Sequence, residues 1–328
     1  MYRRLLTILL AGICVTASAQ ATSFPGAAFQ GSAPFSRASA LLGLAASGCS
    51  RGVGMLSSSL WGGFSLRIAP ASSQQQAELA PCQAEIRDSH GRVVFQTGNW
   101  AVRLHPITGS DLNHDGSPDV VLEAYSGGVH CCWTYSFVSL SNPPRLLAEV
   151  MNEARFDFRR GTKSTEVWTR DGGFDYFETS HVFSPMPRLV VHLRGRQWFN
   201  ASSAHLRDYD RQILEARRRL TPQMIREFQN YKAGNLFAPE FDRTKGLVLS
   251  IVVAYLYSGR EALAWAELQN MWPIADRARI KAAILQARDH GLLSRLHPPA
   301  HRSALRAEWL QLAPQRAPAA SQSSPFGR

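Results

Sequence analysis

Hydrophobic and polar positions alternate in short runs between residues 81 and 200, and this two-residue period is typical of β-strands. The sequence Ser89-His90-Gly91 separates two such runs and predicts a hairpin. In a later run Trp133, Tyr135 and Phe137 share one face. Turns recur at short intervals, so the segment predicts an antiparallel meander. The predicted strands are 84–87, 93–97, 101–104, 120–125, 131–140, 146–151, 154–158, 166–169, 174–179, 189–193 and 197–199.

After residue 200 the hydrophobic period changes to about 3.6 residues, which predicts helices. Thr221 and Pro222 supply an N-cap and a first-turn proline for one of them. The run 247–257 is apolar nearly all round and too short to span a bilayer, so it predicts a buried helix. Residues 258–261 form a capping box that predicts a tight turn between two helices. The other predicted helices are 205–220, 222–234, 261–272 and a last one that ends at Gly291.

The two ends of the chain differ from this central part in composition. Arg3 and Arg4 precede an apolar stretch and Ala17-Ser18-Ala19, the arrangement of a cleavable secretory signal at 1–19. Residues 20–80 are rich in Ala, Ser and Gly and predict a flexible spacer, although apolar clusters near Leu41 and Leu60 allow short helices instead. The tail 313–328 has the composition of a disordered segment.

These patterns predict an α+β fold in five segments. An antiparallel β-meander, built as partial propeller-like blades or a small sandwich, precedes a C-terminal α-helical domain. The segments are the signal peptide 1–19, the spacer 20–80, the β-rich domain 81–200, the helical domain 201–312 and the tail 313–328.

The formal net charge of +11 raises the question of an anionic partner. The basic residues are scattered rather than gathered on one element, and an exported protein rarely meets nucleic acid. The charge therefore predicts a solvated face that attracts anionic envelope surfaces, and no nucleic-acid partner. We expect no transmembrane segment after signal cleavage.

Four cysteines follow the predicted signal, and an even number in an oxidising compartment favours disulfides. Successive strand residues point to opposite faces, so only one of Cys131 and Cys132 can face Cys82. A bridge from Cys82 to one of this pair is the favoured prediction, and a ring between the two neighbours is the alternative. A zinc site at His130, Cys131 and Cys132 is disfavoured because adjacent residues lack the usual ligand spacing.

Residues 111–119 place an oxygen-bearing side chain at every second position, with Gly116 allowing a sharp turn. Calcium takes six to eight oxygen ligands, and a short loop can supply several of them. An EF-hand would need a glutamate where Leu122 stands in a predicted strand, so the pattern favours a calcium loop leading into a strand. The alternative is a metal-free surface turn. The predicted ligands are Asp111, Asn113, Asp115, Asp119 and the carbonyl of Ser117.

The loop and the strand after it resemble the calcium loop of FG-GAP and VCBS repeats, which are blades of integrin-type β-propellers. The stretch 125–135, Tyr-Ser-Gly-Gly-Val-His-Cys-Cys-Trp-Thr-Tyr, resembles a group of exported bacterial proteins in which one such loop is followed by Gly-Gly-Ala-His-Cys-Cys. Val129 replaces that alanine. The resemblance covers residues 80–210 and implies the same five calcium ligands, but it implies no catalytic activity.

No hydrolase elbow, metalloprotease helix or phosphate loop is present in the sequence. Asp175, Glu178 and His181 lie close together on a predicted strand and could serve acid/base chemistry, although the polar face of a strand explains them as well. His130 is the catalytic candidate, and its alternative role is to bond a backbone carbonyl in a crowded turn.

The sequence favours a non-enzymatic protein that is periplasmic or secreted. We expect it to act as a structural or interaction module, with another envelope or extracellular protein or an anionic surface as partner. The alternative is an exported hydrolase that uses His130 and nearby acidic residues.

Overall fold

The computed structural model describes residues 48–74, 78, 80–129, 132–161, 164–230 and 239–296. All of them belong to the compact unit Leu41–Arg328. The predicted signal peptide, the predicted spacer as far as residue 47, the predicted tail, His130 and Cys131 lie outside the described residues.

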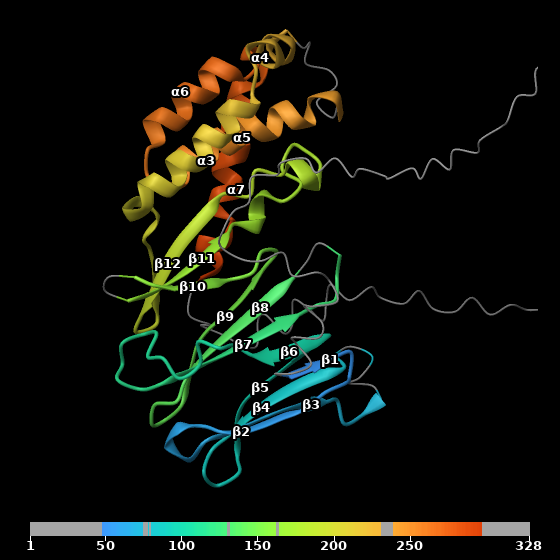
Figure 1. Ribbon diagram of the computed structural model, residues 1–328, viewed down its shortest axis with the longest axis vertical. Coiled ribbons are helices and arrows are strands. Elements are labelled where there is room, and N and C mark those ends of the chain that lie inside the picture. The colour runs from blue at the N-terminus through green and yellow to red at the C-terminus, as the bar shows by residue number, and fades with distance from the viewer. Residues whose placement is uncertain are drawn as a thin grey trace, which may run out of the picture. The chain divides into compact units, whose positions relative to one another are not determined.

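Three antiparallel sheets form the β part of the fold (Figure 1). Within each sheet, neighbouring strands are consecutive in the sequence, except that β1 lies beside β6. The first sheet consists of β2 (Leu56–Ser59), β3 (Ser65–Pro70), β4 (Cys82–Arg87) and β5 (Val93–Asn99). The second has the order β1 (Gly48–Ser50), β6 (Ala101–Leu104), β7 (Asp119–Tyr125), β8 (Trp133–Ser139) and β9 (Arg145–Asn152). The third consists of β10 (Asp157–Arg160), β11 (Thr165–Arg170), β12 (Arg188–Arg194) and β13 (Gln197–Asn200).

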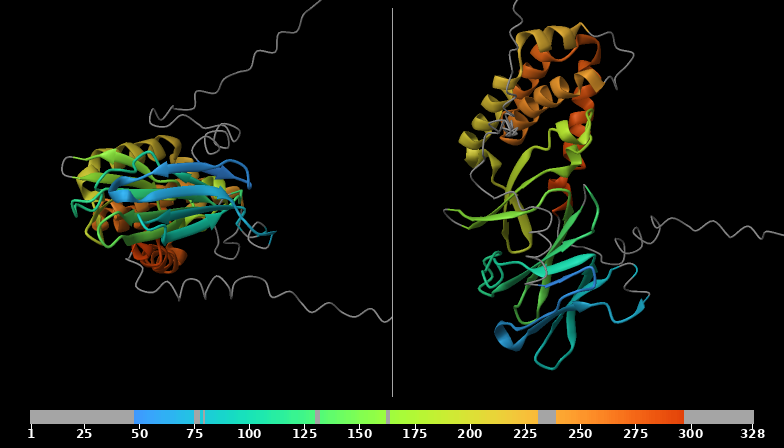
Figure 2. Two further views of the ribbon diagram at one scale, coloured as in Figure 1. Left: turned by 90° about the horizontal axis from the view of Figure 1, so that it is seen from below. Right: turned by 45° about the vertical axis from the view of Figure 1, so that its right-hand side comes forward.

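Helices follow the strands and lie next to the third sheet (Figure 2). The side chain of Thr221 accepts a hydrogen bond from the backbone N–H of Met224 at 3.2 Å, which confirms the predicted N-cap. Within the described helices, none is long and apolar enough to cross a membrane. The helices are α3 (Leu206–Arg219), α4 (Pro222–Gln229), α5 (Asp242–Tyr257), α6 (Glu261–Met271), α7 (Arg277–Asp289) and α8 (Leu292–Arg295).

Two hydrophobic cores meet at β7. Val120 and Leu122 pack with the first sheet, whereas Val121 faces a larger core that contains the third sheet and the helices. Alternate residues of one strand point to opposite faces, so β7 is buried on both sides. This explains the three consecutive apolar residues Val120, Val121 and Leu122. Because the larger core joins β8, β12 and α5, the predicted boundary at residue 200 is not a boundary between cores.

The α+β class and the antiparallel meander are confirmed, and three details of the prediction are wrong. The predicted spacer contains β1, β2 and β3, and in β3 the buried residues Leu66 and Ile68 flank the exposed Arg67. The predicted strand at 174–179 is absent, since Tyr176 and Glu178 adopt positive φ. The capping box is not formed, because the hydroxyl of Ser258 donates to Tyr255 O at 2.9 Å. The described strands form no closed barrel or propeller.

Candidate metal centre

The acidic loop connects β6 to β7, and backbone hydrogen bonds hold it against the first residue of β7. The N–H of Gly109 donates to the carbonyl of Asp119 at 2.8 Å, and the N–H of Asp119 donates to Ser110 O at 3.0 Å. On the other side Leu140 donates to Pro118 O at 3.0 Å. The two ends of the loop are therefore fixed by neighbouring strands.

Side-chain oxygens turn into the loop and bond its backbone. Asp111 accepts from the N–H groups of Asp115 and Gly116 at 3.1 and 3.0 Å. Asn113 accepts from the N–H of Asp115 at 3.2 Å, and Asp115 accepts from the N–H of Ser117 at 2.9 Å. Gly116 has a φ of +82°, a conformation that glycine adopts without strain. The loop is therefore curled before any ligand arrives.

The carboxylate of Asp115 has the largest set of partners in the loop. Its Oδ2 accepts from Asn113 Nδ2 and Ser139 Oγ, each at 2.9 Å, and lies 3.2 Å from Arg145 Nη2. Burial favours the neutral acid, but these hydrogen bonds and the arginine outweigh it and lower the pKa of Asp115. Asp115 is thus held in its ionised form.

The buried carboxylate of Asp119 is the feature of this loop that points most directly to a bound cation. The residue is 0% exposed, and its Oδ2 accepts from the N–H of Leu112 at 2.7 Å. Its Oδ1 is buried and finds no hydrogen-bond donor among the described residues. Burial, together with the nearby charges of Asp115 and Asp111, raises the pKa of Asp119 to about 7. A buried carboxylate oxygen without a donor is costly, and a bound cation would remove that cost.

The oxygen ligands that these side chains offer suit a hard cation, although the side chains do not point toward a common centre. Asp111, Asn113, Asp115 and Asp119 offer only oxygen ligands, as calcium requires. Within the described ranges, no group of three or more His, Cys, Asp or Glu side chains is arranged so as to hold a metal ion. A carboxylate oxygen that accepts one N–H bond keeps a lone pair, so these contacts leave room for coordination.

Comparisons of this chain with protein-family models, with curated proteins and with solved structures find no match.

A second charged cluster, which the sequence analysis missed, lies on the same strand. Glu123 of β7 is fully buried and lies 2.8 Å from Arg103 Nη2 and 2.9 Å from Arg155 Nη2. The hydroxyl of Tyr135 donates to it at 3.1 Å. The strand register places Glu123 opposite both Arg103 and Tyr135. A glutamate inside an apolar strand was the available sequence signal, but the register that supplies its partners is not visible in the sequence.

The Asp175, Glu178 and His181 group is only partly brought together. Asp175 Oδ1 lies 2.7 Å from His181 Nδ1, which makes an acid–histidine pair. Glu178 instead binds Arg279 of α7, with Oε2 at 3.0 Å from Nη2. None of the three residues lies on a strand: Asp175 and Glu178 lie in a loop, and His181 begins a 3-10 helix, His181–Phe183. Asp242 of α5 accepts from Ser180 N–H at 2.9 Å and so fixes this segment to α5.

The disulfide prediction needs a correction. Cys82 is bonded to Cys49, with an S–S distance of 2.02 Å, and not to Cys131 or Cys132. Both sulfurs are buried in the core below the first sheet, because β1 packs beside β3 and β4. The sequence analysis assigned Cys49 to the spacer and so gave it no partner. Cys132 is also disulfide-bonded.

Proposed function

We propose that the protein is an exported, non-enzymatic module of the cell envelope whose β-domain is stabilised by calcium. The buried, unpartnered Oδ1 of Asp119 is the observation that carries this proposal. Asp111, Asn113, Asp115, Asp119 and the Ser117 carbonyl would hold the ion. Calcium would neutralise the three carboxylates, and its binding free energy would add to folding stability.

Two further observations support the proposal. The Cys49–Cys82 disulfide is typical of proteins that fold in an oxidising compartment, in agreement with the signal-like residues 1–19. Extracellular calcium is abundant enough to fill a loop of modest affinity. We also propose that the four-stranded meanders of the first and third sheets are blade-like units of the FG-GAP and VCBS kind.

A calcium titration of thermal stability tests the metal site. The melting temperature of the exported form should rise with calcium, by an amount equivalent to about 2.7 kcal/mol at a hundred times the Kd. Asp115→Ala should abolish the rise. Asp157→Ala is the matched control, because Asp157 is an exposed acid on β10 whose partner is Arg159. An unchanged melting temperature in the wild-type protein at saturating calcium would exclude the proposal.

The second candidate function is hydrolysis. His130 lies outside the described residues, and the Asp175–His181 pair is the observation that favours acid/base chemistry. A carboxylate that orients an imidazole in this way can support a general base. Turnover on a panel of ester, phosphoester, glycoside and peptide substrates should then be lost in His181→Ala or His130→Ala. The exposed His290, which contacts Gln286 O, provides a control substitution. No turnover by the wild-type protein on the panel would count against this candidate.

A further inference from the structure

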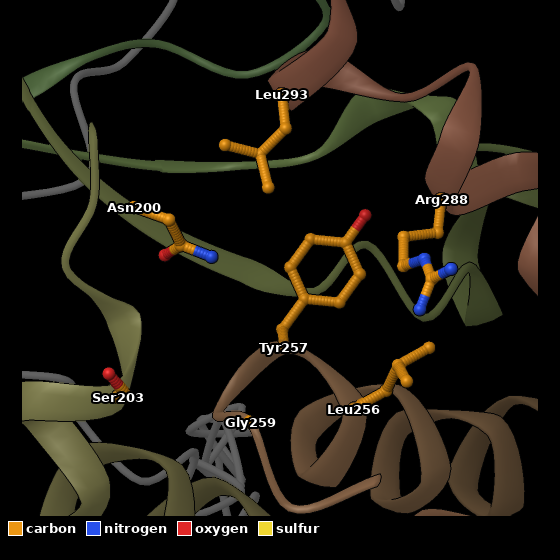
Figure 3. A pocket seen from close by; sticks show the side chains of 7 residues that line it. All are labelled: Asn200, Ser203, Leu256, Tyr257, Gly259, Arg288 and Leu293. Atoms are coloured by element: carbon orange, nitrogen blue, oxygen red, sulfur yellow. The ribbon is translucent and has the colours of Figure 1, made fainter. Parts of the chain in front are cut away.

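A cavity of about 190 Å³ lies where the end of the third sheet meets α5, α7 and α8. Figure 3 shows the ring of Tyr257 at its centre, with Asn200 and Arg288 on opposite sides. Leu293 and Leu256 provide apolar walls. A cavity of about 150 Å³ is large enough for benzene, so this one can take a single ring or a short branched chain.

One buried carboxylate gives this cavity a fixed shape. Asp171 is fully buried and accepts from the hydroxyl of Tyr257 at 2.7 Å. It also accepts from the N–H of Leu292 at 2.9 Å, and so holds the start of α8, which carries Leu293. The ring and one apolar wall are therefore positioned by the same residue. A ligand would meet a preformed site, which lowers the entropy cost of binding.

Hydrogen-bond donors predominate among the polar groups around the cavity. Asn200 Oδ1 accepts from the N–H of Ser202 at 2.9 Å, which leaves its amide nitrogen turned toward Tyr257 (Figure 3). Arg288 uses Nε to bind Asp289 at 2.9 Å, and its terminal nitrogens have no partner among the described residues. Ser203 adds an exposed hydroxyl. The carboxylate of Asp171, which binds the Tyr257 hydroxyl, already accepts from three partners.

A surplus of donors that includes a charged guanidinium favours an anionic ligand, and an arginine fork matches the two oxygens of a carboxylate. We propose that this cavity binds a small organic carboxylate, with the carboxylate on Arg288 and the apolar body against Tyr257 and Leu293. The donors of Asn200 and Ser203 face the opposite end of the ligand. The Arg288–Asp289 pair is largely exposed, with Asp289 at 59%, so Asp289 competes only weakly for the guanidinium.

Benzoate is the probe, and binding is measured on the full-length exported form by calorimetry and ligand-observed NMR, with and without calcium. We expect a saturable site, and Arg288→Gln should weaken it at least about tenfold, as expected when a charge-assisted hydrogen bond is lost. Arg288→Lys should retain part of the affinity. Arg218→Gln is the matched control, because Arg218 is an exposed arginine of α3 away from the cavity, and this variant should bind like wild type.

Neutral benzamide should bind more weakly than benzoate, and phenyl phosphate should not exceed it. The proposal is overturned if benzoate at about 20 mM shows no saturable binding, or if the two glutamine variants bind equally. If benzamide binds as tightly as benzoate, the cavity is not an anion site. If phenyl phosphate binds more tightly than benzoate, the ligand class is phosphate esters and not carboxylates. Because the cavity does not include the acidic loop, benzoate binding in the presence of a chelator separates this proposal from the calcium proposal.

Discussion

Asp119→Asn provides the sharpest test of the acidic loop. The substitution keeps the size of the side chain and an oxygen that can accept from the N–H of Leu112, but it removes the charge. In the calcium-free protein the variant therefore loses the buried charge but keeps the hydrogen bond from Leu112 N–H that orients the side chain.

The magnitude follows from the raised pKa. The ordinary value for an aspartate is 3.8, and in the folded protein the pKa of Asp119 is about 7. The folded state therefore binds this proton more tightly than the unfolded chain, so the contribution of Asp119 to stability falls as the pH rises from about 4 to about 7. At about 1.4 kcal/mol per pH unit, the full cost above pH 7 is about 4 kcal/mol.

Urea unfolding in a chelator, at about pH 5 and about pH 8, measures this cost directly. The variant should be more stable than wild type by about 4 kcal/mol at the higher pH, and the difference should shrink at the lower pH. Calcium at the higher pH should stabilise the wild-type protein and leave the variant unchanged. A variant that is less stable than wild type in chelator at both pH values, or one that keeps the calcium response, would refute the reasoning.

Three other perturbations have defined outcomes. Glu123→Gln should reduce the free energy of unfolding in urea by about 3 to 5 kcal/mol, because it leaves two part-buried arginines without their counter-charge. Glu85→Gln is the control at a more exposed ion pair, and it should cost less than about 1 kcal/mol in the same assay. Replacing Cys49 and Cys82 together by alanine should cost about 3 to 4 kcal/mol in urea, since the bridge closes a separation of 33 residues. Burial lowers the pKa of His105 from 6.5 to about 4, so its contribution to stability is lost as the pH falls from about 6.5 to about 4. His105→Gln should therefore become more stable relative to wild type as the pH falls through this range, measured as the difference between their free energies of unfolding in urea.

Local patterns predicted most strands and helices because burial imposes their period directly. The predicted strand 101–104 coincides with β6, and the apolar run 247–257 lies within α5. The segment 48–70 was misassigned because Gly, Ser and Ala hide the alternation that Leu66 and Ile68 reveal only once their burial is known. The pairing of β1 with β6 joins residues about fifty positions apart, and no short-range signal encodes it.

For the candidate sites, too, the sequence revealed the local patterns but not the long-range contacts. The oxygen ladder of the acidic loop is a local pattern, so the sequence identified its residues. The special position of Asp119 depends on its complete burial at the start of β7, and the partners of Glu123 depend on strand register. The cavity around Tyr257 needs Asp171, which is 86 residues away in the sequence. Such contacts arise from tertiary packing and are not readable from spacing.

Strand β7 links the acidic loop to both cores. It begins at Asp119, carries Glu123 near its end, and contributes side chains to the core of the first sheet and to the core shared with the helices. An unpaired charge at its first residue therefore destabilises the strand that both cores need. Relief of that charge by calcium should stabilise the two cores together, because neither can stay packed if β7 leaves. Calcium should then raise the protection of backbone amides in β3 and in α5 by the same amount, which native-state hydrogen exchange can compare. A change in only one of the two elements would mean that the loop acts on a single core.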